Sequence, residues 1–282
     1  MKSLRLDRAI LVVNSEGVPS VTDDGIMRII RTGKNLGGAG GFARGMEEAL
    51  LLGATWVWTC DDDALPSTEN LVSDLLHVAK STQLDLVAPI IVSPENHLRL
   101  SFPFRDRYRR IWDVASLKKD IILNQAHLFN GTLFSSKILQ SVGLPDARLF
   151  IRGDEQEFLF RIIRAGFKCG TITKSVIVHP SGEDELYPAF FGILRISVPS
   201  SAFKFKYQTR NRGYLTRKYA RFDWFSIDLL RYVSFFLMRR HPSFKGFRIS
   251  LSLYTWGMLG YITREPDLDQ TDWEEINSLR VS

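Results

Sequence analysis

The chain contains few cysteines and no apolar run long enough to cross a membrane. Cys60 and Cys169 are the only two cysteines among 282 residues. Two cysteines make no disulfide framework, and their spacing to the five histidines predicts no zinc site. We expect both to be buried thiols in a reducing compartment. The first eight residues lack the apolar segment that a signal peptide needs. The most apolar stretch, residues 222–240, is interrupted by Asp228 and Arg231 and is shorter than a membrane span.

The composition is otherwise that of an ordinary globular protein, with 45% apolar and 24% charged residues. We expect two parts, a domain over residues 1–200 and a helical C-terminal region over residues 201–282. The net charge of +6 is concentrated in the second part, because residues 201–248 contain twelve Lys or Arg against two Asp. The C-terminal region is therefore expected to bind a partner of negative charge.

Basic and large aromatic side chains alternate in that C-terminal region. The combination favours a helix lying on an anionic membrane surface, with Trp224, Phe225, Phe235 and Phe236 entering the interface. A packed helical subdomain or a self-association surface is the alternative. Nucleic-acid binding is disfavoured, because no recognition motif accompanies the charge. We predict a cytoplasmic protein with peripheral contact at the inner face of the cell membrane.

Three consecutive aspartates, Asp61, Asp62 and Asp63, follow residues 54–59, a run typical of a buried strand. Carboxylates held this close repel one another, and a bound cation is the simplest compensation. Mg²⁺ and Mn²⁺ take such oxygen ligands and share them with substrate phosphates. Side chains alternate along an extended segment, so Asp61 and Asp63 would point to one side and Asp62 to the other. The alternative is a solvated acidic loop.

Strand-like and helix-like segments alternate over the first 180 residues, which predicts an α/β domain with a mostly parallel sheet. Strands are expected at residues 9–14, 28–31, 54–59, 84–91, 128–134 and 175–180, and helices at residues 42–52, from 66 onward and at 154–165. Residues 95–125 show no clear pattern. Ligands of such sheets bind at the carboxyl ends of the strands, which is where the three aspartates lie.

Two further groups have a functional and a structural interpretation. Asp154, Glu155 and Glu157 open a predicted helix, where free amide groups and the helix dipole favour acidic residues in any case. His179 ends a predicted strand, and a lone histidine there is more often structural than a ligand. Position alone therefore assigns neither group a function.

Five motifs follow one another along the chain: NLGGAGGFARG at 35–45, DDD at 61–63, FNG at 129–131, GDEQEF at 153–158 and VH at 178–179. In this order they resemble the family-2 group of inverting GT-A glycosyltransferases. The chain is most similar to galactofuranosyl- and rhamnosyltransferase-like members, which build bacterial surface polysaccharides. The resemblance covers about residues 9–215 and implies a Rossmann-like GT-A domain.

The resemblance implies a metal and donor site around the aspartates. Asp61 and Asp63 match the residues that contact the nucleotide sugar and hold Mn²⁺ or Mg²⁺ on its diphosphate, and Asp62 lies with them in the donor site. His179 matches the histidine that completes the metal site in many members. In this light the ligand interpretation of His179 is preferred to the structural one.

The resemblance also implies a general base and a loop under the donor. Glu155, with Asp154 beside it, matches the acidic pair that supplies the base; we prefer Glu155, because the second acidic position is the base in related sequences. The loop comprises Asn35, Gly37, Gly38, Gly40 and Gly41. Its small residues let the backbone approach the donor closely.

The activity that these residues imply is an inverting sugar transfer. A base takes the acceptor hydroxyl proton as that oxygen attacks the anomeric carbon, and a cation stabilises the departing nucleoside diphosphate. UDP-galactofuranose and dTDP-rhamnose are both candidate donors, and the glycine-rich loop with the triple aspartate favours the former. The acceptor is expected to be a glycan or a lipid-linked sugar.

The chain departs from the family pattern at its start. The strand and helix that normally precede a segment like residues 9–14 are not seen, and Asn14 stands where an aspartate is often found. We expect the strand at 9–14 to lack a neighbour, which predicts poor donor binding and aggregation or homo-oligomers. The alternative function is a catalytically impaired GT-A-like protein that acts as a binding or assembly partner. A sugar-nucleotide pyrophosphorylase is disfavoured, because no glycine-rich basic loop directly follows the first strand.

Overall fold

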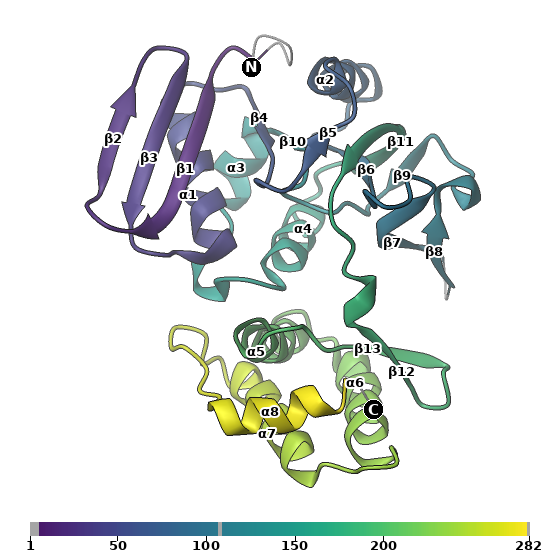
Figure 1. The fold of residues 1–282 in the computed structure, drawn as a ribbon. Coiled ribbons are helices and arrows are strands. Elements are labelled where there is room, and N and C mark those ends of the chain that lie inside the picture. Colours follow the sequence, from purple (N-terminus) through teal and green to yellow (C-terminus); the bar gives the residue numbers. More distant parts are fainter. Residues whose placement is uncertain (1–5, 107–108, 281–282) are drawn as a thin grey trace. The chain divides into compact units, whose positions relative to one another are not determined.

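The computed structural model describes residues 6–106 and 109–280 and divides the chain into two compact units (Figure 1). The first unit runs to Ala147 and resumes over Glu155–Gly182. The second consists of Arg148–Asp154 and Glu183–Ser282. The division therefore falls earlier than the predicted boundary at residue 200, and a short segment ahead of Glu155 groups with the C-terminal part.

A small three-stranded sheet forms the beginning of the first unit and is coloured purple in Figure 1. It contains β1 (Ala9–Glu16), β2 (Ser20–Asp23) and β3 (Met27–Gly33) in the order β1-β3-β2. β1 is parallel to β3, and β2 is antiparallel to it. The expectation that the strand at 9–14 lacks a neighbour is therefore wrong, because β3 pairs with it, although within the described part of the chain β1 is an edge strand of this sheet.

The main sheet of the first unit has eight strands, and its central order is β4-β10-β6-β11-β5. The strands of this path are β4 (Trp56–Thr59), β5 (Leu65–Pro66), β6 (Leu86–Val92), β10 (Thr132–Ser135) and β11 (Cys169–Val178). The region at 95–125, whose sequence showed no clear pattern, contributes three further strands that pair antiparallel with the main sheet or with each other. They are β7 (Arg99–Asp106), β8 (Arg109–Asp113) and β9 (Ile121–Leu123).

The main sheet is less parallel than predicted. Among its described strands, β6 with β11 is the parallel pair, whereas β4 with β10 and β10 with β6 are antiparallel. The difference arises because β10 lies between β4 and β6 with the opposite direction. β4, β6 and β11 nevertheless all run the same way, as the strand–helix rhythm indicates.

The helices of the first unit cover this sheet with apolar faces. They are α1 (Gly37–Leu51), α2 (Leu71–Thr82), α3 (Ser136–Val142) and α4, which spans Asp154–Arg164 and starts at the boundary of the units. In α2 the buried residues Leu71, Leu75 and Ala79 recur every four positions, as a helix packed on a sheet requires. α2 starts later than the predicted residue 66, because Leu65 and Pro66 pair with β11.

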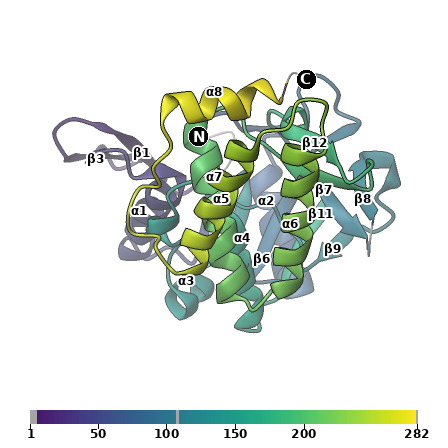
Figure 2. The same ribbon diagram turned by 90° about the horizontal axis from the view of Figure 1, so that it is seen from below.

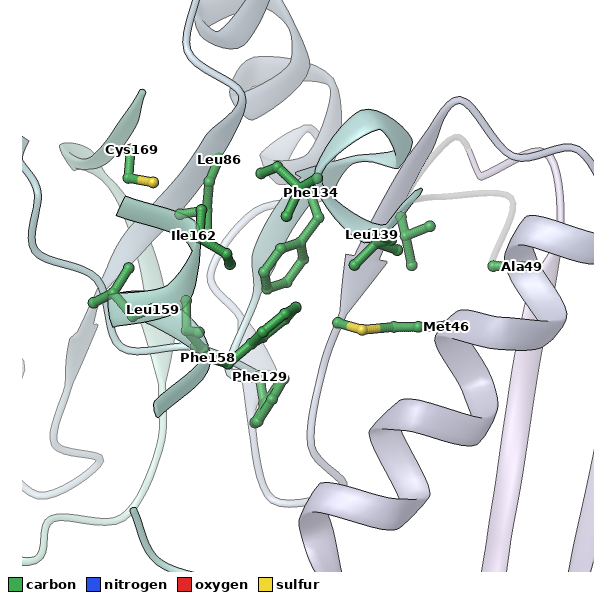
Figure 3. Close-up of a cluster of buried hydrophobic side chains, with 13 residues drawn as sticks. Met46, Ala49, Leu86, Phe129, Phe134, Leu139, Phe158, Leu159, Ile162 and Cys169 are labelled. Carbon is green, nitrogen blue, oxygen red and sulfur yellow. The ribbon is translucent and has the colours of Figure 1, made fainter. Parts of the chain in front are cut away.

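The first unit is held together by an aromatic core (Figure 3). Phe158 of α4 is fully buried and lies between Phe129, which precedes β10, and Phe134 in β10, with ring centroids 6.4 and 5.8 Å away. Met46 of α1 belongs to the same cluster. Burying one such side chain contributes about 1.5–3 kcal/mol. The apolar side of α4 thus anchors a helix whose first turn carries the acidic run.

The second unit is a β-hairpin followed by four helices (Figure 2). The hairpin pairs β12 (Leu186–Ala189) with β13 (Leu194–Ser197), and the helices are α5 (Ala202–Lys218), α6 (Phe222–Leu237), α7 (Phe244–Met258) and α8 (Gln270–Ser278). Side-chain caps define three helix starts: Ser201, Ser243 and Asp269 each accept a hydrogen bond from the backbone N–H three residues further on.

Short 3₁₀ turns occur in both units and not in the second unit alone. They occupy Val114–Ser116, Ala147–Leu149 and Glu183–Glu185.

The aromatic residues predicted to enter a membrane are instead core residues of this unit. Phe235 and Phe236 have no exposed surface, Trp224 is 8% exposed, and Phe225 packs against the same cluster. The assignment of these four side chains to a membrane interface is therefore wrong, and the helical-subdomain interpretation applies to them. None of the helices in the described ranges is both long and apolar enough to cross a membrane.

α5 and α7 touch at two glycines. A Cβ at Gly213 of α5 would lie 1.9 Å from the carbonyl oxygen of Tyr254, and a Cβ at Gly257 of α7 would lie 1.8 Å from that of Arg210. These obstacles are backbone atoms, which cannot rotate away. Only glycine at both positions permits this helix–helix distance.

We predict that Gly213→Ala destabilises the protein. Alanine gains about 1 kcal/mol in helix propensity over glycine, but separating two packed helices costs about 1–3 kcal/mol or more. Urea unfolding should therefore show a net loss, whereas Ser252→Ala on the exposed side of α7 should be neutral or stabilising. A Gly213→Ala variant as stable as the parent protein would contradict the close helix contact.

Candidate active site

The carboxyl ends of β4, β6 and β11 lie at one edge of the main sheet. The backbone N–H of His179, directly after β11, donates to the carbonyl of Val92 at the end of β6 (3.0 Å). Residues 61–63 follow β4, which runs in the same direction. The sheet thus gathers the residues after its strands at one place, where ligands of such folds bind.

Asp61, Asp62 and Asp63 lie in a turn and not in an extended segment. β4 ends at Thr59, and the N–H of Ala64 donates to the carbonyl of Asp61 (3.3 Å). One carboxylate oxygen of each aspartate lies within 4.8 Å of the others, and all three residues are exposed. The expectation that Asp62 points away is therefore wrong, because a turn does not alternate its side chains between two sides as a strand does.

His179 adjoins this turn through Asp63. Its Nε2 lies 3.0 Å from Oδ1 of Asp63, and its Nδ1 lies 2.7 Å from the carbonyl oxygen of Pro180. A carbonyl only accepts, so Nδ1 carries a proton and donates. In the neutral ring, Nε2 then presents a lone pair to the carboxylate, and the two repel unless a proton or a cation lies between them. Metal-binding histidines have this orientation, with the far N–H held by a carbonyl.

The thiol beside the aspartates is held in its protonated form. Burial, together with the charges of Asp61 and Asp63, raises the pKa of Cys60 to about 11. The protonated thiol donates to the carbonyl of Ala64 (3.3 Å). Loss of solvent also raises the pKa of Asp61, with the neighbouring carboxylates adding to it. Both cysteines are free thiols; Cys169 is buried, as predicted, whereas Cys60 is only half-buried.

The glycine-rich motif forms the first turns of α1, not the predicted loop. α1 begins at Gly37, although glycine disfavours helix. Gly45 packs closely against β1, because a Cβ there would lie 3.2 Å from Val12; at Gly41 a Cβ would make an ordinary contact, 3.4 Å from Nδ2 of Asn14. Packing against β1 therefore outweighs local propensity. The helical motif glycines assigned to the donor site are Gly37, Gly38, Gly40 and Gly41.

Two asparagines order the entry to α1. Asn14 accepts from the N–H of Leu36 (2.7 Å) and donates to the carbonyl of Gly37 (2.8 Å), and Oδ1 of Asn35 accepts from the N–H of Gly37 (2.9 Å). An aspartate at position 14 could accept but not donate. Asn14, which departs from the family pattern, thus both accepts a hydrogen bond from the backbone at the start of α1 and donates one to it.

The acidic run at the start of α4 separates into different environments. Glu157 is fully buried and pairs with Arg161 (3.0 Å), so its role is structural. Asp154 is 5% exposed, whereas Glu155 is half-buried and more accessible. Of the acidic pair, Glu155 is therefore the better placed to meet an acceptor.

Two polar residues near the strand ends were not assigned from the sequence. His127 is buried between Phe102 and Phe104, and this burial lowers its pKa to about 4, so the ring is neutral. Asn130 is 5% exposed, and its Oδ1 has no hydrogen-bond partner in the described chain. The next residue, Gly131, donates its N–H to Thr59 at the end of β4 (2.8 Å). No periodic pattern marks either residue; only the FNG motif pointed to the second.

Comparison with known proteins gives the following relatives. No protein-family model matches the chain. Galactofuranosyltransferase GlfT1 of Mycolicibacterium smegmatis is 39% identical over 214 residues, which are 73% of this chain and 71% of the relative. Galactofuranosyltransferase GlfT1 of Mycobacterium tuberculosis (strain H37Rv) is 37% identical over 223 residues, 74% of this chain and 70% of the relative. The crystal structure of GalNAc-T7 with UDP, GalNAc and Mn²⁺ matches at a TM-score of 0.52 and 13% identity.

The match to GalNAc-T7 covers 90% of this chain, which spans 50% of that structure. This likeness shows the fold of a GT-A glycosyltransferase, as predicted. The mycobacterial relatives identify the family within this fold. The chain belongs to the family of the mycobacterial galactofuranosyltransferases GlfT1 and is a glycosyltransferase.

The geometry of the turn predicts that Asp62→Asn weakens Mn²⁺ binding about as much as Asp61→Asn and Asp63→Asn. Each change removes one charged oxygen from the same cluster, and a loss of about tenfold corresponds to 1.4 kcal/mol. Titration of Mn²⁺ followed by electron paramagnetic resonance measures this.

Asp120→Asn is the matched control, because this exposed aspartate lies on the same unit and pairs with Lys174 away from the turn. If Asp62→Asn bound Mn²⁺ as the parent does, while the other two variants did not, the result would support the alternating arrangement of the side chains. If all three variants bound Mn²⁺ as the parent does, the cluster would be a solvated acidic turn and not a metal site.

Proposed function

We propose that the chain transfers galactofuranose from UDP-galactofuranose to a glycan or lipid-linked acceptor, with inversion at the anomeric carbon. The observation that carries the proposal is the contact between His179 and Asp63 beside two further aspartates at the strand ends. The names of the relatives support galactofuranose over rhamnose as the sugar. The UDP in the structural neighbour is compatible with a UDP-linked donor.

The residues present fit a divalent ion. Three exposed carboxylates and one imidazole with its Nδ1 already engaged form a mixed oxygen and nitrogen set. That set favours Mn²⁺ over Mg²⁺, which takes oxygen ligands in proteins. When bound, the ion would neutralise the diphosphate of the donor as it leaves. The three aspartates and His179 would hold this ion.

Glu155 is proposed as the base. It takes the proton of the acceptor hydroxyl while that oxygen bonds to the anomeric carbon, and the bond from this carbon to the diphosphate oxygen breaks. Its position in the first turn of α4 keeps it ionised, because the free amide groups and the helix dipole favour negative charge there. Asp154 beside it is more deeply buried.

The test is a donor panel assayed for release of UDP or dTDP in the presence of Mn²⁺. We expect turnover of UDP-galactofuranose and little of dTDP-rhamnose. Glu155→Gln should leave donor binding nearly intact and lower kcat by about 10²- to 10⁴-fold, the usual contribution of a general base. Calorimetry measures donor binding by the same variant.

Asp154→Asn is the control within the pair. If it were the more damaging change, the base would be Asp154. Absence of turnover with every donor, together with intact donor binding, would support the catalytically impaired binding protein instead.

Peripheral membrane contact is proposed with residues other than those named from the sequence. Phe191 and Ile193 at the tip of the β12–β13 hairpin are 82% and 76% exposed. Ile227 and Leu230 of α6, and Met238 directly after it, are 36%, 45% and 51% exposed. The spacing of the last three places them on one face of α6. We call these five residues the hairpin–α6 surface.

The two parts of the hairpin–α6 surface are adjacent. The N–H of Phe190 donates to Oγ of Ser234, which lies on the same face of α6 (2.6 Å). Phe190 and Phe191 both have left-handed backbone angles, φ 45° and 55°, which bulky residues rarely adopt. The hairpin thus holds Phe191 outward at a conformational cost. Exposed arginines, Arg195 and Arg240, flank the apolar residues, and anionic lipid complements this combination.

Flotation with phosphatidylcholine vesicles, with and without phosphatidylglycerol, tests this surface. The parent protein should float only with the anionic lipid, and Phe191→Ser/Ile193→Ser should lower binding at least about tenfold, because two apolar side chains no longer enter the bilayer. Leu51→Ser/Leu98→Ser, exposed to a similar degree on the first unit, should bind as the parent does. Flotation unaffected by the hairpin change would contradict the surface. Loss of a homo-oligomer in that variant, without any lipid dependence, would make it a self-association surface.

A further inference from the structure

The segment that leads into α4, residues 149–153, has a strained backbone. Phe150 and Arg152 have φ angles of 65° and 64°, in the left-handed region that bulky residues avoid, and Gly153 has 90°. Such a conformation persists only where surrounding groups hold it. Asp154 and Glu155 follow directly, so the path of this segment sets where α4 begins.

One buried side chain holds most of this segment. Asn211 of α5 has no exposed surface, and its Nδ2 donates to the carbonyls of Leu149 (2.8 Å), Ile151 (3.0 Å) and Arg152 (2.7 Å). Three carbonyl oxygens that converge on one point repel one another unless a donor lies between them. The amide of Asn211 is that donor, and it therefore stabilises the turn that the left-handed residues make.

Arg210 fixes the orientation of this amide. Its Nε and Nη2 donate to Oδ1 of Asn211 (2.9 and 2.7 Å), so the nitrogen of the amide must face the segment. The guanidinium also donates to the carbonyls of Arg148 (3.1 Å) and Arg264 (2.9 Å). Arg210 is 1% exposed, so these contacts lie inside the protein.

The segment packs closely against α5 at Gly153. A Cβ at Gly153 would lie 3.3 Å from Cβ of Asn211 and 3.6 Å from Leu215. Phe150 stacks on Tyr207 of the same helix, with ring centroids 5.0 Å apart. α5 therefore contacts both the backbone and a side chain of the segment.

We propose that Asn211, oriented by Arg210, is a positioning residue for the acidic pair. It holds residues 149–153 in the strained conformation from which α4 starts, and so fixes the carboxylates of Asp154 and Glu155 for proton transfer. This role rests on the proposed base, since Asn211 acts through the segment and not on substrate.

The test uses Asn211→Leu and Asn211→Asp in the full chain. Leucine removes the donors at similar volume, and aspartate replaces them with acceptors facing three carbonyls. We expect kcat to fall at least about 10²-fold, because a misplacement on the order of 1 Å has that effect, while KM for the donor and Mn²⁺ binding stay near their parent values. Hydrogen–deuterium exchange of residues 148–156 should rise in both variants.

Thr216→Val is the matched control. Thr216 is equally buried on α5 and bonds to the hydroxyl of Tyr254 (2.7 Å), away from the segment. It should reduce stability without changing kcat or the exchange of residues 148–156. Equal kcat losses in the Asn211 and Thr216 variants would overturn the positioning role, as would faster exchange with kcat retained.

Exchange also separates this inference from the proposed function. If the parent protein showed no sugar transfer, the proposed activity would be wrong. Hydrogen–deuterium exchange in residues 148–156 would still test whether Asn211 holds the segment at residues 149–153. Unchanged exchange in both Asn211 variants would overturn the inference, whatever the activity.

Discussion

The parallel pairing of β6 with β11 is the contact on which the site depends. Its register places Val178 opposite Val92, and the next residue, His179, bonds to the Val92 carbonyl. β10 then returns between β6 and β4, so that β4 runs in the same direction as β6. Two successive reversals restore the direction, and the aspartate turn and the histidine emerge at one edge. A single reversal would place them at opposite ends of the sheet.

A second constraint acts at the close approach of α5 and α7. The carbonyl of Arg210 lies where a side chain at Gly257 would be, so this part of α5 cannot shift without separating the helices. Arg210 and Asn211 lie in that same turn of α5. A rigid helix pair is thus the support for a strained segment, and the segment continues covalently into the helix that bears Glu155. Strain near a functional group persists here because packing over-determines the backbone.

Much of the fold could be predicted from local patterns. Apolar runs correctly indicated β1, β4 and β6, and the acidic start with apolar residues behind it indicated α4. The five ordered motifs identified the family, because each depends on residue type and order alone. The patterns failed where tertiary contacts outweighed them. The glycines of α1 form helix against β1, and β7 and β9 form strands because β6 and β11 pair with them.

The sequence alone determined which chemistry is available, because carboxylates, an imidazole and a basic C-terminal region are properties of residue types. It also determined where most strands and helices lie, since hydrophobic periodicity is local. Only the tertiary structure decided that Asp62 joins Asp61 and Asp63, because the end of β4 at Thr59 converts an expected strand into a turn. It likewise decided which apolar residues of α6 are buried. Phe235 and Leu230 are both large apolar residues of that helix, and packing against α5, α7 and the hairpin buries Phe235 while Leu230 stays 45% exposed.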